Sequence, residues 1–141
     1  MSRRASITSL ALALLLGCRT TAAGSGPSLV TVRECVGDVV PLCGTLRIAG
    51  DGRAAYERRG LRTRTGRLRP AELEGLQKAL RSANFLAFEG NDRASGSLVT
   101  IETAAGTRTF PVAALPPPVT PFVEEVHRIG KRLFGRNFGA M

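Results

Sequence analysis

Apolar and polar residues alternate in three short segments of the first half of the chain. Residues 29–34 (LVTVRE) and 44–49 (GTLRIA) follow the period of two that is typical of a half-buried strand. Residues 50–52 (Gly-Asp-Gly) supply the turn of a tight hairpin, because glycine and aspartate tolerate positive φ angles. Residues 53–59 then return as the partner strand. The pattern predicts three consecutive antiparallel strands.

Two later segments carry apolar residues at helical spacing. The first helix is expected to begin at Pro70, a residue preset for the first turn, and to end at Asn84. The second is expected to have Thr120 as its N-cap and to end at Gly135. Each has one apolar stripe, formed by Leu73, Leu76, Leu80 and Ala83 in the first helix and by Phe122, Val126, Ile129 and Leu133 in the second.

A second hairpin is expected between the two helices. Residues 97–103 and 107–112 predict its strands, and Gly106 lies in its turn. Pro116 to Pro118 are expected to form a rigid connector into the last helix; the alternative is a ligand for an aromatic groove. The element order is then β-β-β-α-β-β-α. We therefore expect an α+β fold, with an antiparallel sheet of about five strands and two amphipathic helices on one face.

The N-terminus has the layout of an export signal. Arg3 and Arg4 precede residues 7–16 (ITSLALALLL), a run that has the length of a signal-peptide core and is too short to span a bilayer. Leu15-Leu16-Gly17-Cys18 follows and resembles the lipobox of bacterial lipoproteins. The resemblance implies that residues 1–17 are removed and that Cys18 carries the two or more acyl chains that stable anchoring needs. The alternative is a plain secretory signal with an incidental cysteine.

The segment behind Cys18 is expected to be a flexible tether. Residues 19–28 (RTTAAGSGPS) are small and polar, and ten such residues have a root-mean-square reach of roughly 17–19 Å. The chain is thus divided into a signal peptide (1–17), a lipidated N-terminus with its tether (18–28), a single domain (29–136) and a C-terminal tail (137–141). Arg19 stands where lipoproteins retained in the inner membrane of enteric bacteria have Asp. The resemblance therefore implies a lipid anchor in the outer membrane of the bacterial envelope, facing the periplasm.

Two cysteines remain once Cys18 is acylated. Cys35 and Cys43, as an even pair in an exported protein, favour a disulfide. Closing that short loop stabilises a fold by roughly 2.5 kcal/mol on the loop-entropy argument. A metal site would need His127 and a fourth ligand as well, and redox-active pairs more often have two residues between their cysteines. We expect a structural disulfide, no metal and no cofactor.

The charge of the chain favours anionic partners. The net charge is +9, and without Arg3 and Arg4 the remaining 18 basic and 11 acidic residues give +7. The alternative explanation is codon bias, because Lys occurs only at positions 78 and 131 and all other basic residues are Arg.

Arginines are densest between residues 53 and 69, a segment with seven of them and one acid, Glu57. An extended backbone over residues 61–65 places Arg62 and Arg64 on the same face. Guanidinium groups in a row suit phosphate or carboxylate, because each makes two parallel hydrogen bonds. Nucleic acid is not an expected partner, since stacking aromatic residues are missing. The candidate anion-binding residues are Arg58, Arg59, Arg62 and Arg64; the alternative is a solvated edge strand.

The order of landmarks from Cys35 to the last helix resembles a family of bacterial domains of unknown function, many of them lipoproteins. The matching landmarks are Cys35-Val36-Gly37, Pro41, Asp51-Gly52, Tyr56, Phe85, Phe88 and the stretch from Pro118 to Leu133. The family's segment reads Cys-x-Gly-x-Cys-Pro-x-Tyr; in this sequence the second cysteine, Cys43, follows Pro41 instead of preceding it, and the Tyr of that segment is missing. The resemblance implies the same order of hairpins and helices, and it implies no activity.

No catalytic motif is present in the sequence. His127, the only histidine, lies at the border of an apolar stripe, with no nucleophile near it in the chain. Nothing singles out two of the 11 carboxylates as an acid–base pair. We expect a membrane-anchored, non-enzymatic binding or assembly module that contacts anionic lipid, acidic glycan or another envelope protein. A periplasmic enzyme of unrecognised type is the alternative.

Overall fold

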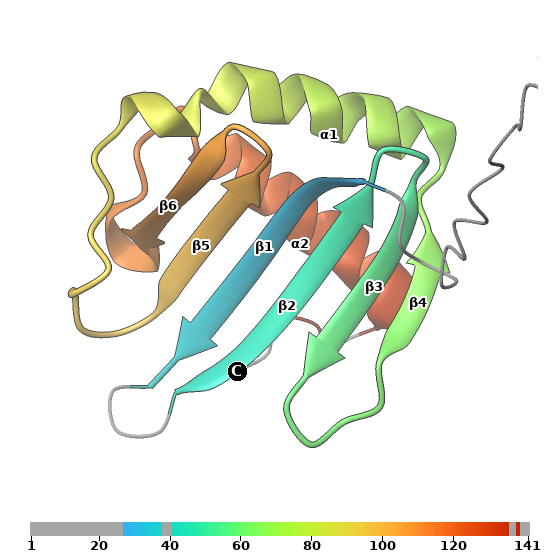
Figure 1. Ribbon diagram of the computed structural model, residues 1–141, viewed down its shortest axis with the longest axis horizontal. Coiled ribbons are helices and arrows are strands. Elements are labelled where there is room, and N and C mark those ends of the chain that lie inside the picture. Colours follow the sequence, from blue (N-terminus) through green and yellow to red (C-terminus); the bar gives the residue numbers. More distant parts are fainter. Residues whose placement is uncertain (1–26, 38–40, 136–137, 139–141) are drawn as a thin grey trace, which may run out of the picture.

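The computed structural model describes residues 27–37, 41–135 and 138 (Figure 1). These residues form an α+β fold in which a six-stranded antiparallel sheet packs against two helices, so the predicted fold class is confirmed. The strands are β1 (Ser28–Val36), β2 (Leu42–Ala49), β3 (Arg53–Arg58), β4 (Arg64–Arg67), β5 (Leu98–Thr103) and β6 (Gly106–Pro111). The helices are α1 (Pro70–Ala83) and α2 (Thr120–Phe134), with single 3-10 turns η1 (Phe85–Ala87) and η2 (Val112–Ala114).

The first hairpin forms the centre of the sheet. The strand order is β4-β3-β2-β1-β5-β6, and each neighbouring pair is antiparallel. Strands β3 and β4 extend the sheet on the side of β2, and β5 and β6 extend it on the side of β1 (Figure 1).

Strand β4 is the element that the sequence-based order lacks. It pairs with β3, with Arg64 opposite Tyr56 and Arg67 opposite Arg53. None of its four residues is buried, so no alternation of apolar and polar residues marks it in the sequence. It lies under α2, where a Cβ added to Gly66 would come within 3.0 Å of the Leu133 side chain. The observed order is therefore β-β-β-β-α-β-β-α, with six strands rather than about five.

One face of the sheet carries the core. The alternation expected for the strands places apolar side chains toward the helices, and both helices contribute to the same hydrophobic cluster. In Figure 1, α2 passes behind the sheet and α1 runs across its upper end. The largest fully buried side chains of this cluster are Val30, Leu46, Ile48, Leu76, Val99, Ile101, Phe110, Val119, Phe122, Val126 and Ile129.

The helix ends follow the sequence signals closely. Helix α1 begins at Pro70, and the backbone N–H of Arg69 donates to the Glu72 carboxylate at 2.8 Å. It ends at Asn84, which adopts the left-handed conformation with φ 43°. Helix α2 begins at Thr120, and its N-cap is the buried Val119 instead of Thr120. The backbone turn from Pro116 to Val119 fixes this start, with a 2.9 Å hydrogen bond between the two residues.

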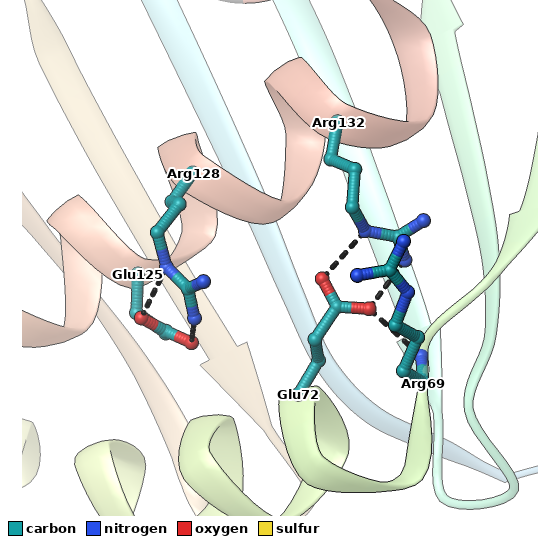
Figure 2. A network of polar contacts seen from close by, with 5 residues as sticks. All are labelled: Arg69, Glu72, Glu125, Arg128 and Arg132. Atoms are coloured by element: carbon teal, nitrogen blue, oxygen red, sulfur yellow. Dashed lines mark hydrogen bonds and ion pairs between the residues drawn. The ribbon is translucent and has the colours of Figure 1, made fainter.

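A carboxylate on α1 joins the two helices. Glu72 accepts a 2.7 Å hydrogen bond from Arg132 Nε, and a second, shorter one from the same guanidinium group (Figure 2). The Glu72 side chain is 9% exposed, and the hydrogen bonds from Arg132 hold its pKa below the ordinary value of 4.5. Glu125 and Arg128 pair within α2 beside it (Figure 2). The contact between the helices is thus apolar with a charged pair at its border.

The outer edge of β6 is covered by the chain that follows η1. Arg108 Nε donates to the carbonyl of Phe88 at 3.1 Å, and its terminal nitrogen donates to that of Leu86 at 3.2 Å. The backbone N–H of Asn91 donates to the carbonyl of Thr109 at 2.7 Å. A covered edge cannot pair with a strand of another chain.

Different connections lie at the two ends of the sheet. The chain enters β1 beside the β2–β3 turn, where the N–H of Gly50 donates to the carbonyl of Pro27 at 3.4 Å. The β3–β4 connection, residues 59–63, lies at the opposite end (Figure 1). At about 3.3 Å per residue, β1 separates the two ends by roughly 26 Å.

Candidate functional site

Three of the four candidate arginines line one hollow. Its lining consists of Tyr56, Arg58, Leu61, Arg62, Arg64, Phe134 and Phe138, and its volume is about 80 Å³. We call this the arginine hollow. Arg58 and Arg64 point toward the helix side of the sheet because they occupy the same strand face as Tyr56: Arg58 is two residues further along β3, and Arg64 is paired with Tyr56 across the ladder. Arg62 reaches the hollow from the β3–β4 connection.

Arg64 is fixed by contacts with the end of α2. Its guanidinium group donates to the backbone carbonyl of Phe134 and lies over the Phe134 ring, 5.7 Å from the centroid. This carbonyl belongs to the last turn of the helix, where carbonyl groups lack a partner within the helix. Arg64 therefore serves both the helix end and the hollow.

Arg58 and Arg62 are available for a ligand. Within the described residues, neither forms an ion pair or a side-chain hydrogen bond with the protein. Arg62 is exposed, and Arg58 is half-buried beside the Tyr56 ring.

Arg59 lies apart from the other three. It is exposed on the β3–β4 connection and lines a different depression, on the sheet face opposite the helices. The sequence-predicted set is therefore divided: Arg62 and Arg64 line the hollow, Arg59 lines the other depression, and Arg58 at the end of β3 lines both.

The wall of the hollow is aromatic. Tyr56 stacks on Phe134 with ring centroids 5.5 Å apart, and it contacts Phe138 at 4.9 Å. Phe138, in the segment expected to be a C-terminal tail, is 6% exposed and lies on α2 where Gly130 has no side chain, because a Cβ there would overlap its ring. An aromatic wall below a cationic rim provides apolar contact for the body of a ligand and charge for its anionic end.

The hydroxyl group of Tyr56 lies at a second, smaller cavity. The Tyr56 hydroxyl is buried without a hydrogen-bond partner among the described residues, at a cavity of about 10 Å³ that Glu34 also lines. Burial raises the pKa of the phenol above its ordinary value of 10.0; the charge of Arg58 opposes this shift and that of Glu34 adds to it. Glu34 is hydrogen-bonded to His127 Nε2, and this contact joins β1 to α2.

The predicted disulfide is present. Cys35 and Cys43 are directly opposite each other on β1 and β2, with Cα atoms 4.1 Å apart, and they form a bond. It closes the loop end of the first hairpin, at the same end of the sheet as the arginine hollow.

Other site classes find little support in the part of the chain that the structure describes. No group of three or more His, Cys, Asp or Glu side chains lies close enough together to hold a metal ion there. Among the same residues, no helix has the length and apolar character needed to cross a bilayer. The expected lipidation site, Cys18, and the expected signal peptide, residues 1–17, lie outside the described residues.

Sequence reasoning missed the polar pairs that long-range folding creates. Glu34 and His127 are 93 residues apart, and Glu72 and Arg132 are 60 apart, so no spacing pattern connects them.

No protein-family model and no curated protein matches the chain. The functional argument therefore depends on the geometry of the chain itself.

Proposed function

We propose that this protein is a lipid-anchored envelope lipoprotein whose domain is a non-enzymatic binding module for an anionic group. The anchor is the lipobox cysteine, Cys18, and its expected location is the outer membrane, facing the periplasm. The single observation that carries the binding proposal is the arginine hollow. In it, Arg58 and Arg62, which have no side-chain polar partner among the described residues, lie with the fixed guanidinium group of Arg64 beside an aromatic wall.

The chemistry of the hollow favours phosphate or carboxylate. A guanidinium group presents parallel N–H donors that match both groups, and charge-assisted hydrogen bonds of this kind are about twice as strong as neutral ones. A hollow of about 80 Å³ has room for a small anionic group, since one water molecule needs roughly 10–15 Å³ by the same measure.

The neighbouring polar residues support binding over catalysis. Glu34 and His127 are hydrogen-bonded to each other, and neither residue lines the arginine hollow. The raised pKa of Tyr56 keeps its phenol protonated at neutral pH, so it is a poor nucleophile. The lining of the hollow, as far as the structure describes it, holds no Asp, Glu, His, Ser or Cys, so the hollow itself offers none of these as a general base or nucleophile.

The position of the hollow relative to the start of β1 favours a ligand other than a lipid headgroup of the leaflet that holds the anchor. The hollow extends from the level of Val32, whose register Tyr56 and Arg64 share, to the β3–β4 connection, roughly 13–26 Å along β1 from its start. The expected ten-residue tether has a root-mean-square reach of roughly 17–19 Å, so bringing the far end of the hollow onto the anchoring membrane requires a tether more extended than average. A free anion, an acidic glycan or another envelope protein meets the hollow more easily than a headgroup of the same leaflet.

The lipid anchor is tested by Cys18→Ser. We expect the variant to leave the membrane fraction and to lose palmitate labelling, because the thiol is the site of acylation. A variant that still fractionates with membranes and carries label contradicts the lipoprotein proposal.

The hollow is tested by the double change Arg58→Gln and Arg62→Gln. Binding of inorganic phosphate, followed by the chemical shifts of the Tyr56 region, is expected to weaken about tenfold, as roughly two exposed charge contacts are lost. The matched control is Lys78→Gln with Arg81→Gln, two exposed cations of α1, which should bind as the wild type does. Vesicles containing phosphatidylglycerol form a second arm that distinguishes a lipid headgroup from a free anion. Equal phosphate binding by the wild type and the hollow variant contradicts the proposal.

A further inference from the structure

The face of the sheet opposite the helices is open and polar. Side chains that alternate with the core residues of β1, β2, β3 and β5 project there, and they form a shallow depression of about 610 Å³. Neither α1 nor α2 covers it, since both pack on the other face. A volume of this size is within the range of ligand-binding clefts, about 300–1,000 Å³.

We propose that this open face is a second binding surface, and that it takes an acidic polysaccharide. The proposal does not depend on the arginine hollow: its decisive residues, Arg33 and Arg59, are different and lie on the other side of the sheet.

The register places arginines and threonines in alternation across the two central strands. Arg33 on β1 lies opposite Thr45 on β2 and Thr100 on β5. One step along the ladder the order is reversed, because Arg47 on β2 lies opposite Thr31 on β1. Neighbouring strands are about 4.8 Å apart. Cationic and hydroxyl groups therefore repeat in two directions over a nearly flat surface.

The charges on this face leave an excess of positive groups. Its lining holds Arg33, Arg47, Arg58 and Arg59 against Glu57 and Glu102. Arg47 is paired with Glu57 at 2.8 Å. The one side-chain contact of Arg33 within the described residues is with the sulfur of Cys43 at 3.5 Å, and Arg59 has no ion pair there. Unpaired guanidinium groups on an open surface attract an anionic partner.

The other lining groups indicate a sugar polymer as the anion. The hydroxyl groups of Thr31, Thr45, Thr63 and Thr100 both donate and accept hydrogen bonds, as the hydroxyl groups of a sugar do. The lining holds no aromatic side chain, which disfavours single-stranded nucleic acid because its bases bind by stacking. Leu61 is its one large apolar side chain, too little for the apolar centre of a protein interface.

The surface is tested with polygalacturonate, a polymer of carboxylate-bearing sugars, and the purified full-length protein in mild detergent at about 50 mM salt. The test variant is Arg33→Gln with Arg59→Gln, and the matched control is Arg81→Gln with Arg93→Gln, two exposed arginines away from this face. We expect the test variant to bind about tenfold more weakly and the control to bind like the wild type. Thermal unfolding of each variant verifies that it is folded.

Further arms separate this surface from the alternatives. Binding of polygalacturonate should survive Arg62→Gln, a change in the arginine hollow alone, so a failure of the arginine hollow and a failure of the open face are distinguishable. Neutral dextran should not bind. The proposal is overturned if polygalacturonate does not bind, if the test variant binds it as tightly as the wild type, or if polyglutamate binds equally well, which would assign the face to an acidic protein segment.

Discussion

At the scale of single residues, the missing side chain of Gly44 leaves room for the ring of a buried tyrosine. A Cβ built on Gly44 would lie 2.6 Å from the hydroxyl oxygen of Tyr56, on the neighbouring strand β3. The tyrosine ring therefore occupies the space that a side chain at position 44 would need. Its hydroxyl has no hydrogen-bond partner in the described part of the chain.

We predict that Gly44→Ala lowers the free energy of unfolding by about 1–3 kcal/mol, the usual cost of overpacking. Tyr56→Phe should be nearly neutral or stabilising, because it removes a buried polar group that lacks a partner. In the Tyr56→Phe background the cost of Gly44→Ala should decrease, since the closest clash disappears. Urea unfolding of the two single variants and the double variant measures the coupling. Additive costs would show that the hydroxyl is not the obstacle.

Arg64 differs from the other candidate arginines in its structural contacts. Because it donates to the carbonyl of Phe134 and lies over that ring, Arg64→Gln should lower the free energy of unfolding by about 1–2 kcal/mol. Arg62→Gln, two residues away on the exposed β3–β4 connection, is the matched control and should change the free energy of unfolding little. Thermal unfolding compares the two. Equal midpoints would mean that the contact with α2 contributes nothing to stability.

At the scale of the elements, the Glu72–Arg132 pair makes the α1–α2 contact sensitive to acid. The pKa of Glu72 is lowered in the folded state, so its contribution is present above the ordinary value of 4.5 and is lost as the pH falls through the folded value. Glu72→Gln should lower the free energy of unfolding by about 2 kcal/mol at neutral pH.

The pH profile gives the sharper test of this pair. The difference between the wild type and Glu72→Gln should shrink below about pH 4.5 and vanish under the folded pKa. Glu74→Gln changes an exposed carboxylate of the same turn and serves as control, with a profile parallel to that of the wild type. Urea unfolding at a series of pH values between neutral and acid provides the data. A constant difference at all pH values would rule out the linkage.

The first hairpin is the element whose stability depends on the disulfide. Changing Cys35 and Cys43 together to Ser should lower the free energy of unfolding by about 2.5 kcal/mol, because the short loop between them is no longer closed in the unfolded chain. Thiol counting on the wild type should find neither cysteine reactive until reductant and denaturant are both added. Two reactive thiols in protein isolated from the envelope would contradict the bond.

The elements show what the sequence could and could not predict. The bounds of helix α1 and of the hairpin strands were predicted within one or two residues, because the spacing of apolar residues and the turn residues determine them locally. Strand β4 was missed because its residues Arg64–Arg67 bury nothing and form a strand only by pairing with β3. The start of α2 shifted to Thr120 because Val119 is held by tertiary packing.

The candidate site could be predicted only in part for the same reason. The density of arginines near Arg58 identifies the segment, but the side of the sheet each one faces depends on where β3 ends and β4 begins. Arg59 thus separates from Arg62 and Arg64. The open face was missed altogether, since Arg33 and Thr100 come from segments that meet only when the sheet forms.

At the scale of the whole molecule, the two faces of the sheet differ from each other, and so do its two ends. The helix side closes the core and presents the arginine hollow at its rim; the other side presents the open face. Both proposed surfaces adjoin the β3–β4 connection, as Leu61 lines each of them, and this connection is far from the entry of β1. Both proposed surfaces therefore reach the end of the sheet opposite the start of β1.

The central position of the first hairpin has a consequence for the order of folding. A chain that emerges from its N-terminus completes β1 and β2 first, and Cys35 and Cys43 can join them before either helix has been made. This closed hairpin then offers two unpaired edges. The β3–β4 pair is next in the chain and adds through a tight turn, whereas β5 must return to β1 across the whole of α1. Long-range pairing is the slower kind, so the β5–β6 half should set the folding rate. The disulfide-bonded β1–β2 hairpin should therefore be complete before β5 and β6 pair with it.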